Sequence, residues 1–346
     1  MKNLIAIILT SVMLVFQANA QEGKVITVNI HAVSLEGNLV GDSPNRNVSI
    51  YLPPGYDKDL DKRYPVLYLL HGFSGNKTGG NNWEWAFNAS DINEIITSGT
   101  VSPMIIVMPD ACNQFGGSMY TNSITTGFWE DFITYDLPDF VDANYRSIPR
   151  RESRGIAGHS MGGYGAIKIA MKHPDIFGSV YGTSACCMDQ NPGNFKAKRV
   201  IDAMAVRSLD DIPEASFGSK TYLASAAAFS PNPAKPPFYA DFPFKITDGS
   251  LTMNEHVRAM WLANYPSWMA DQYVANLQRL HGISFDAGNR DIPGLLESNQ
   301  YFSMILNRLN VQNKFEVFDG GHGDKVGERI KTKILPFFSE QLTNDN

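Results

Sequence analysis

The sequence predicts an α/β fold in which a mostly parallel central sheet carries helices on both faces. Short runs of β-branched and aromatic residues alternate with helical patterns along most of the chain, which is typical of parallel sheets with crossover helices. Two of these runs, 65–70 and 104–108, are continuously apolar, as strands buried on both faces are. The chain has 346 residues, 43% hydrophobic and 18% charged, which allows a large core and excludes disordered, collagen-like and coiled-coil proteins.

Eight segments read as strands, and the first two alternate between apolar and polar residues, so we expect them to form an antiparallel edge. The expected strands are Val25–Val33, Val48–Leu52, Pro65–Leu70, Met104–Met108, Arg154–Gly158, Val180–Ser184, Ile283–Phe285 and Lys314–Phe318. Helices are expected between or after them at Phe128–Tyr145, Met161–Lys172, Leu295–Leu309 and Asp324–Leu342.

The alternation stops between about residues 188 and 280. This segment holds two helical patterns, Asn194–Val206 and Asn254–Leu280, on either side of the Pro- and aromatic-rich stretch Phe229–Phe244. Because it lies inside the βα series, we interpret it as a cap-like insertion over one end of the sheet, within a single domain covering 21–346. An independent domain is the alternative.

The first 20 residues have the pattern of a signal peptide. Lys2 is followed by an apolar run from Leu4 to Phe16, and Ala18-Asn19-Ala20 fits a signal peptidase site. We expect cleavage after Ala20 and a secreted or periplasmic protein without a membrane anchor; an uncleaved N-terminal anchor is the alternative. Lys and Arg total 29 against 35 Asp and Glu, without runs of like charge, so a nucleic-acid partner is not expected.

Export would expose the three cysteines to an oxidising compartment. The odd count leaves at least one free thiol, and adjacent Cys186 and Cys187 would bond each other only with strain. A bridge from Cys112 to one of them stays open. The sequence has no CxxC or HExxH spacing, so no zinc site is expected.

A candidate nucleophile lies in Gly158-His159-Ser160-Met161-Gly162, which fits the G-x-S-x-G pattern. The motif follows a short apolar strand and opens a helix, so Ser160 would occupy a sharp strand-to-helix turn at a helix N-terminus, where developing negative charge is stabilised. The alternative is a serine that only caps the helix.

A serine hydroxyl needs a base, and His322 is the best placed of seven histidines. It follows the strand Lys314–Phe318 in a Gly-Gly-His-Gly loop, at the strand end where active sites of open α/β sheets gather. The acid that orients it should precede it in the chain, and Asp291 is favoured over Asp286 because its loop has room to reach His322. The amides of Phe73 and Met161 are the expected oxyanion donors.

These residues resemble the esterase D-like branch of the α/β-hydrolases, which includes S-formylglutathione hydrolases, feruloyl and acetylxylan esterases, enterochelin esterase-like proteins and antigen 85 mycolyltransferases. The matching stretches span nearly the whole chain after residue 20: Tyr51–Tyr56, Pro65–Gly72, Tyr120-Thr121-Asn122, Trp129-Glu130, Gly158–Gly163, Gly288–Asp291 and Gly320–His322. The resemblance implies an α/β-hydrolase fold, and it adds weight to Asp291, since the family's acid closes a G-x-x-D loop. The long insertion departs from the compact members.

The resemblance also suggests that aromatic residues near the cleft, Tyr120, Trp129, Phe238 and Tyr239, contact substrate; core packing is the alternative for each. Glu130 fits a buried structural carboxylate better than a catalyst.

The sequence therefore predicts a secreted serine carboxylesterase that needs no metal or organic cofactor. Ser160, His322 and Asp291 would act on a small-molecule or polysaccharide-linked ester, such as feruloyl or acetyl groups on plant polysaccharide. An acyltransferase using the same three residues, a non-catalytic carbohydrate- or partner-binding relative, and a peptidase are the alternatives. The sequence leaves the oligomeric state open.

Overall fold

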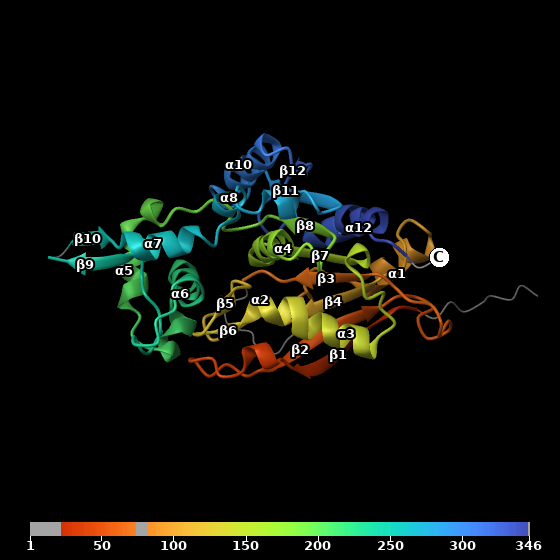
Figure 1. Cartoon of the computed structure of the whole chain (residues 1–346), viewed down its shortest axis with the longest axis horizontal. Helices are drawn as coiled ribbons and strands as arrows, with labels where there is room; N and C mark the ends of the chain where they lie inside the picture. The colour runs from red at the N-terminus through yellow and green to blue at the C-terminus, as the bar shows by residue number, and fades with distance from the viewer. Residues whose placement is uncertain (1–21, 74–81, 249, 345–346) are drawn as a thin grey trace, which may run out of the picture.

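A computed structural model of the chain describes residues 22–73, 82–248 and 250–344. The predicted signal peptide lies outside the described residues. The centre of the molecule is an eight-stranded sheet with the strand order β1-β2-β4-β3-β7-β8-β11-β12 (Figure 1). The α/β class predicted from the sequence is confirmed.

All of the predicted strands are present in this sheet. They are β1 (Lys24–His31), β2 (Asn45–Leu52), β3 (Val66–Leu70), β4 (Ile105–Pro109), β7 (Arg154–His159), β8 (Ser179–Thr183), β11 (Gly282–Gly288) and β12 (Lys314–Phe318). Strand β1 pairs antiparallel with β2, and β2 with β4, while β4, β3, β7, β8, β11 and β12 run parallel. The two alternating strands thus form the antiparallel edge.

The central strands are buried on both faces because their side chains alternate between two apolar clusters. In β3, Val66, Tyr68 and Leu70 belong to one cluster, whereas Leu67 and Leu69 belong to the other. The first face is covered by α4 (Met161–Lys172), α10 (Leu295–Arg308), α2 (Trp129–Asp131), a π-helical turn (Phe132–Asp136) and α3 (Leu137–Asn144). The second face is covered by α1 (Ala89–Thr97), α11 (Val326–Arg329), a π-helical turn (Ile330–Ile334) and α12 (Leu335–Gln341).

Residues 188–280 form short elements, most of which lie beside one end of the sheet, in green to cyan at the left of Figure 1, whereas residues 266–269 lie near α10. They are α5 (Ala197–Ala205), α6 (Phe217–Phe229), the hairpin β9 (Phe244–Thr247) and β10 (Ser250–Met253), α7 (Glu255–Leu262), α8 (Pro266–Met269) and α9 (Val274–Leu277). The predicted single helix over 254–280 is wrong. Pro266 disfavours helical backbone at the residue before it, and α7 ends at Leu262.

The remaining regular elements are short. Strands β5 (Asn122–Ser123) and β6 (Gly127–Phe128) form a hairpin, and 3-10 turns occur at Val33–Leu35, Arg151–Ser153, Pro192–Asn194 and Leu209–Glu214. Within the described residues, none of the helices has the length and apolar character needed to cross a bilayer.

Candidate active site

Ser160 occupies a strained turn between β7 and α4. Its φ of 56° and ψ of −116° lie in a region that non-glycine residues rarely adopt. The turn is tight because α4 begins directly against β3: a Cβ on Gly162 would lie 1.9 Å from the Leu70 carbonyl oxygen. Glycine at this position therefore lets the helix approach the sheet, and the turn projects Ser160 beyond the end of β7.

The structure brings Ser160, His322 and Asp291 together in one hydrogen-bonded chain. The Ser160 hydroxyl donates to His322 Nε2 at 2.9 Å, and His322 Nδ1 donates to Asp291 Oδ1 at 2.7 Å. His322 follows β12 and Asp291 follows β11, so both come from loops after parallel strands. This is the arrangement in which an imidazole can take the serine proton while a carboxylate holds its tautomer.

Asp286, the alternative acid, is engaged elsewhere. It is fully buried in β11, where the Arg329 guanidinium of α11 pairs with Oδ2 and the Tyr181 hydroxyl donates to the same oxygen at 2.6 Å. Thr183 donates to its other oxygen. Burial raises the pKa of Asp286, although these partners oppose that effect. Both carboxylate oxygens are occupied, so Asp286 is a structural residue beneath the site.

Asp291 has the electrostatics of an ionised acceptor. Burial has the largest single effect and would raise the pKa of Asp291, but the hydrogen bond from His322 and the other nearby donors and charge together outweigh it, so the pKa lies below its usual value. Oδ1 also accepts the backbone N–H of Ile292 at 2.7 Å. Asp291 is therefore suited to stabilise a positive charge on His322.

His159, the residue before the nucleophile, supports the loop that carries His322. Its Nε2 donates to the backbone carbonyl of His322 at 2.8 Å, and the two imidazole rings lie 4.8 Å apart. Burial, followed by the nearby His322, lowers the pKa of His159 to about 4, so it stays neutral near pH 7. Trp85 covers the ring in an edge contact at 5.7 Å. Only its place in the G-x-S-x-G motif could have drawn attention to this role.

The amides of Phe73 and Met161 both lie beside Ser160. Met161 is the first residue of α4, where helical hydrogen bonds leave N–H groups without partners. A Cβ on Gly72 would lie 3.2 Å from Ser160 Cβ, so the Gly72–Phe73 peptide packs against the nucleophile. His71 fixes that peptide: its Nε2 accepts the Ala111 N–H at 2.8 Å, so the proton is on Nδ1, which donates to the Gly72 carbonyl at 2.6 Å.

A mainly apolar cavity of about 150 Å³ opens beside Ser160. Its lining comes from Ser160 and His322, from the insertion and from other loops that follow the strands. The lining residues are Phe73, Met119, Ser160, Met161, Cys186, Cys187, Gln190, Arg199, Phe217, Thr221, Ser225, Ile292, Leu295 and His322. Arg199, Phe217, Thr221 and Ser225 were not singled out in the sequence, because no motif marks them.

The predicted substrate contacts at Tyr120, Phe238 and Tyr239 are not among the residues that line this cavity. Tyr120 is fully buried, and its hydroxyl donates to the His71 carbonyl at 2.9 Å, next to the Gly72–Phe73 peptide. Phe238 packs on Phe115 at 6.4 Å, and the Tyr239 carbonyl accepts the Thr125 hydroxyl at 2.6 Å. Phe238 and Tyr239 join the insertion to the rest of the chain, and Tyr120 packs beneath His71, which fits the core-packing alternative.

Trp129 and Glu130 also have packing roles. Trp129 is fully buried, and the Arg46 guanidinium lies 5.0 Å from its ring centroid. Glu130 pairs with Lys172 and with His173, the latter at 2.8 Å. Burial would raise the pKa of Glu130, but the His173 hydrogen bond and the neighbouring lysines lower it to about 2. It is a buried structural carboxylate.

The three cysteines are free thiols, so the bridge from Cys112 that the sequence left open is not formed. Cys112 lies with His71 and Asp110 in a buried group whose ligand atoms fall within 4.8 Å of one another. The group does not fit a metal ion. His71 Nε2 already accepts the Ala111 N–H, and the Arg46 guanidinium pairs with Asp110 at 3.1 Å, placing a positive charge where a cation would bind.

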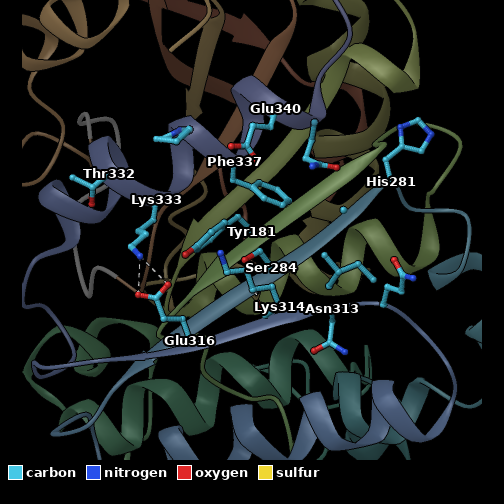
Figure 2. A pocket seen from close by; sticks show the side chains of 15 residues that line it. Tyr181, His281, Ser284, Asn313, Lys314, Glu316, Thr332, Lys333, Phe337 and Glu340 are labelled. Atoms are coloured by element: carbon cyan, nitrogen blue, oxygen red, sulfur yellow. Dashed lines mark hydrogen bonds and ion pairs between the residues drawn. The ribbon is translucent and has the colours of Figure 1, made fainter. Parts of the chain in front are cut away.

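A larger groove of about 480 Å³ lies elsewhere on the molecule, where Figure 2 shows Tyr181, Ser284, Lys314 and Phe337 along its walls. His281 lies just before β11 and Ser284 near its start, so the groove lies at the opposite strand ends from Ser160. The Ser284 hydroxyl donates to the Lys314 carbonyl at 3.3 Å. The groove therefore has no part in the Ser160 site.

The parallel sheet, the strained serine turn and the order Ser160, Asp291, His322 along the chain define an α/β-hydrolase. The family model described as "Putative esterase" matches residues 43–325. The chain belongs to this esterase family, which confirms the resemblance seen in the sequence.

Among curated proteins, the chain is 35% identical over 140 residues to Esterase Rv1288 of Mycobacterium tuberculosis, covering 39% of this chain and 28% of that protein. It is 33% identical over 156 residues to the endo-1,4-beta-xylanase/feruloyl esterase of Xylanibacter ruminicola, covering 43% of this chain and 20% of that protein. The matched segment thus spans less than a third of either relative.

Solved structures share the fold over nearly the full length. A ferulic acid esterase superposes with a TM-score of 0.65 at 24% identity, covering 94% of this chain and 100% of the other. The serine hydrolase FphF of Staphylococcus aureus gives a TM-score of 0.61 at 22% identity, covering 92% and 99%.

Proposed function

We propose that this chain is a serine carboxylesterase with Ser160 as nucleophile, His322 as general base and acid, and Asp291 as the carboxylate that orients the imidazole. The observation that carries the proposal is the continuous hydrogen-bonded chain from Ser160 Oγ through His322 to Asp291, built on a strained strand-to-helix turn. Membership of the esterase family supports it.

The geometry supports a two-step reaction. His322 Nε2 takes the Ser160 proton as Oγ attacks the ester carbonyl, and the imidazolium is stabilised by Asp291. The N–H groups of Met161 and Phe73 would bind the developing oxyanion, and His71 would hold the second of them through the Gly72 carbonyl. His322 then protonates the leaving alcohol, and water, activated by the same imidazole, hydrolyses the acyl-enzyme.

The substrate class is proposed from the relatives' names and the cavity. One relative is named a xylanase/feruloyl esterase, and a similar fold belongs to a ferulic acid esterase. A narrow, mainly apolar cavity next to Ser160 is compatible with an aromatic or short acyl group. Feruloyl or acetyl esters on plant polysaccharide are therefore the first substrates to test.

The test compares wild type, Ser160→Ala and Ser153→Ala on 4-nitrophenyl acetate, 4-nitrophenyl butyrate and methyl ferulate. Ser153 is a buried serine outside the site and serves as the matched control. We expect Ser160→Ala to lose about 10⁴-fold or more in kcat/KM, whereas Ser153→Ala keeps turnover. Turnover that survives Ser160→Ala, or a folded wild type inactive on every ester, would contradict the proposal.

Export is also a proposal and rests on residues 1–20 alone. Cell fractionation with N-terminal sequencing tests it: a mature chain that begins at Gln21 outside the cytoplasm is expected, and an uncleaved chain inside it would contradict the proposal.

A further inference from the structure

The cavity beside Ser160 contains a single permanently charged side chain among the described residues that line it. This is Arg199 of α5, in the insertion, and it shares the cavity with Ser160 and His322. The remaining walls are mainly apolar, with Phe73, Phe217 and Leu295 among them. A guanidinium in such surroundings interacts strongly with an anion, because low polarity weakens the screening of charge.

Arg199 is held in place by neutral groups. Its Nε donates to the Gly218 carbonyl at 3.1 Å, its Nη2 donates to the Thr221 hydroxyl at 3.0 Å, and Cζ lies 4.6 Å from the centroid of the Phe195 ring. These contacts use two of the five N–H groups of the guanidinium. The side chain is therefore fixed, while its remaining donors are free to bind a ligand.

No carboxylate of the described residues pairs with Arg199. Two buried arginines do have such a partner: Arg329 pairs with Asp286, and Arg154 pairs with Asp142. Arg146 is partly buried and, among the described residues, also pairs with no carboxylate, but it packs on Tyr56 and does not line this cavity. Arg199 is partly buried, and a charge partly withdrawn from water without a counter-ion carries a cost, so the missing negative charge points to a ligand that supplies it.

We propose that Arg199 binds a carboxylate carried by the ester substrate, so that esters with one negative charge are the preferred substrates of this chain. The inference rests on the proposed esterase function, because Ser160 must attack an ester held in the same cavity. A carboxylate matches the planar guanidinium and its single positive charge. A phosphate carries close to two negative charges and would keep one of them uncompensated.

The competing explanation is that Arg199 only ties α5 to α6 through Gly218 and Thr221. A purely structural arginine would affect folding and all esters alike. A carboxylate-binding arginine changes the ratio of kcat/KM between an anionic ester and its neutral counterpart. The ratio therefore separates the two explanations.

The experiment uses ester pairs that differ only in the carboxylate. On the acyl side these are mono(4-nitrophenyl) succinate and 4-nitrophenyl butyrate; on the alcohol side they are 2-carboxyethyl ferulate and propyl ferulate. Wild type is compared with Arg199→Gln, Arg199→Lys and the control Lys198→Gln, whose side chain is 85% exposed on the same helix. The fold of each variant is monitored by thermal unfolding.

Wild type should prefer the anionic ester of one pair. Arg199→Gln should reduce the anionic-to-neutral ratio of kcat/KM by about 10- to 100-fold, mainly through KM, because a charge-assisted hydrogen bond is lost. Arg199→Lys should recover part of the ratio, and Lys198→Gln should leave it unchanged. A wild type that prefers the neutral ester in both pairs, or an equal ratio in wild type and Arg199→Gln, would overturn the inference.

The outcome is distinguishable from failure of the esterase proposal. If neutral esters are hydrolysed in a Ser160-dependent way and the ratio does not respond to Arg199, only the carboxylate site is wrong. If no ester is hydrolysed, calorimetric titration of Ser160→Ala with monoethyl succinate and with ethyl butyrate tests the site directly. Monoethyl succinate should bind at least tenfold more weakly when Arg199→Gln is added, and unchanged or absent binding would overturn the inference.

Discussion

Two regions hold their side chains in different ways: the carboxyl ends of the parallel strands, where Ser160 lies, and the insertion. At the strand ends, Ser160 follows the buried strand β7. The nearby carboxylate of Asp286 is fixed by Tyr181, Thr183 and Arg329. In the insertion, Arg199 lies on a short helix that buries only Val200 and Ala203, and two hydrogen bonds hold it. We infer that the sheet sets the chemistry, whereas the insertion sets which ester is accepted.

The largest expected effect distinguishes the roles of the two aspartates in and after β11, Asp286 and Asp291. Asp291→Asn should lower kcat by about 10⁴-fold with little change in Tm, because an amide no longer favours the reactive tautomer of His322. Asp286→Asn should instead cost about 3 kcal/mol of stability, since it leaves the buried Arg329 with only the more distant carboxylate of Glu316 at 3.8 Å.

Steady-state kinetics and thermal unfolding of both variants measure this difference. A large loss of kcat in a fully folded Asp286→Asn, with Asp291→Asn still active, would reverse the assignment of the acid.

The next prediction tests whether the insertion can be destabilised without loss of turnover at Ser160. Trp261 is fully buried against Tyr222 and Phe229, so Trp261→Ala should cost about 3–5 kcal/mol. Trp268, whose side chain is 47% exposed, gives the control Trp268→Ala.

Limited proteolysis should cut the Trp261→Ala variant within residues 188–280 while turnover of 4-nitrophenyl acetate persists. Loss of that turnover in parallel with the cleavage would show that the two regions form one cooperative unit.

A smaller effect concerns pH and His159. Its folded pKa of about 4 lies below the unfolded value of about 6.5, so the unfolded chain takes up the proton first as pH falls. Above pH ~6.5, His159 is neutral in both states and contributes its full share to the free energy of unfolding. As pH falls to ~4, the free energy of unfolding decreases by about 3 kcal/mol, because the unfolded chain binds the proton.

His159→Gln, which can retain a donor to the His322 carbonyl, should flatten this part of the stability curve. Denaturant unfolding between pH 7 and pH 4 measures it, and identical slopes for wild type and variant would show that His159 does not titrate in this way.

The smallest effect lies at the mouth of the cavity. Phe217 is 62% exposed and meets Phe73 edge to face at 5.7 Å. Phe217→Ala should raise KM for aromatic esters by about fivefold and leave kcat nearly unchanged, because one aromatic contact is worth about 1 kcal/mol. Comparing methyl ferulate with 4-nitrophenyl acetate checks this, and an equal change in both would argue against a substrate contact.

The sheet could be predicted because each of its strands carries a local signal. Runs such as 66–70 and 105–109 are apolar throughout, and the nucleophile turn needs glycine where α4 meets β3. Ser160 and His322 follow from a motif and from a position after a strand. The loop position and the G-x-x-D resemblance favoured Asp291 over Asp286, but the sequence could not show what Asp286 does instead, because its partner Arg329 lies 43 positions further along the chain.

The insertion was predicted less well because its helices lack a clear period. Helix α6 ends in the run SAAAF, which is buried on all sides and has no amphipathic pattern, so it was missed. Phe238 and Tyr239 were expected at the substrate because of the family resemblance, but aromatic residues suit a core equally well. Only the packing of the insertion on Phe115 decides between these roles.

The central claim is that Ser160 is activated by His322. Peptide mapping after brief treatment with a fluorophosphonate, which traps activated serines irrespective of the deacylation rate, tests it most directly. A single adduct on Ser160 is expected in wild type, with none at this position in Ser160→Ala and much slower labelling in His322→Ala. A folded wild type that is not labelled, or one labelled at another residue, would contradict the claim.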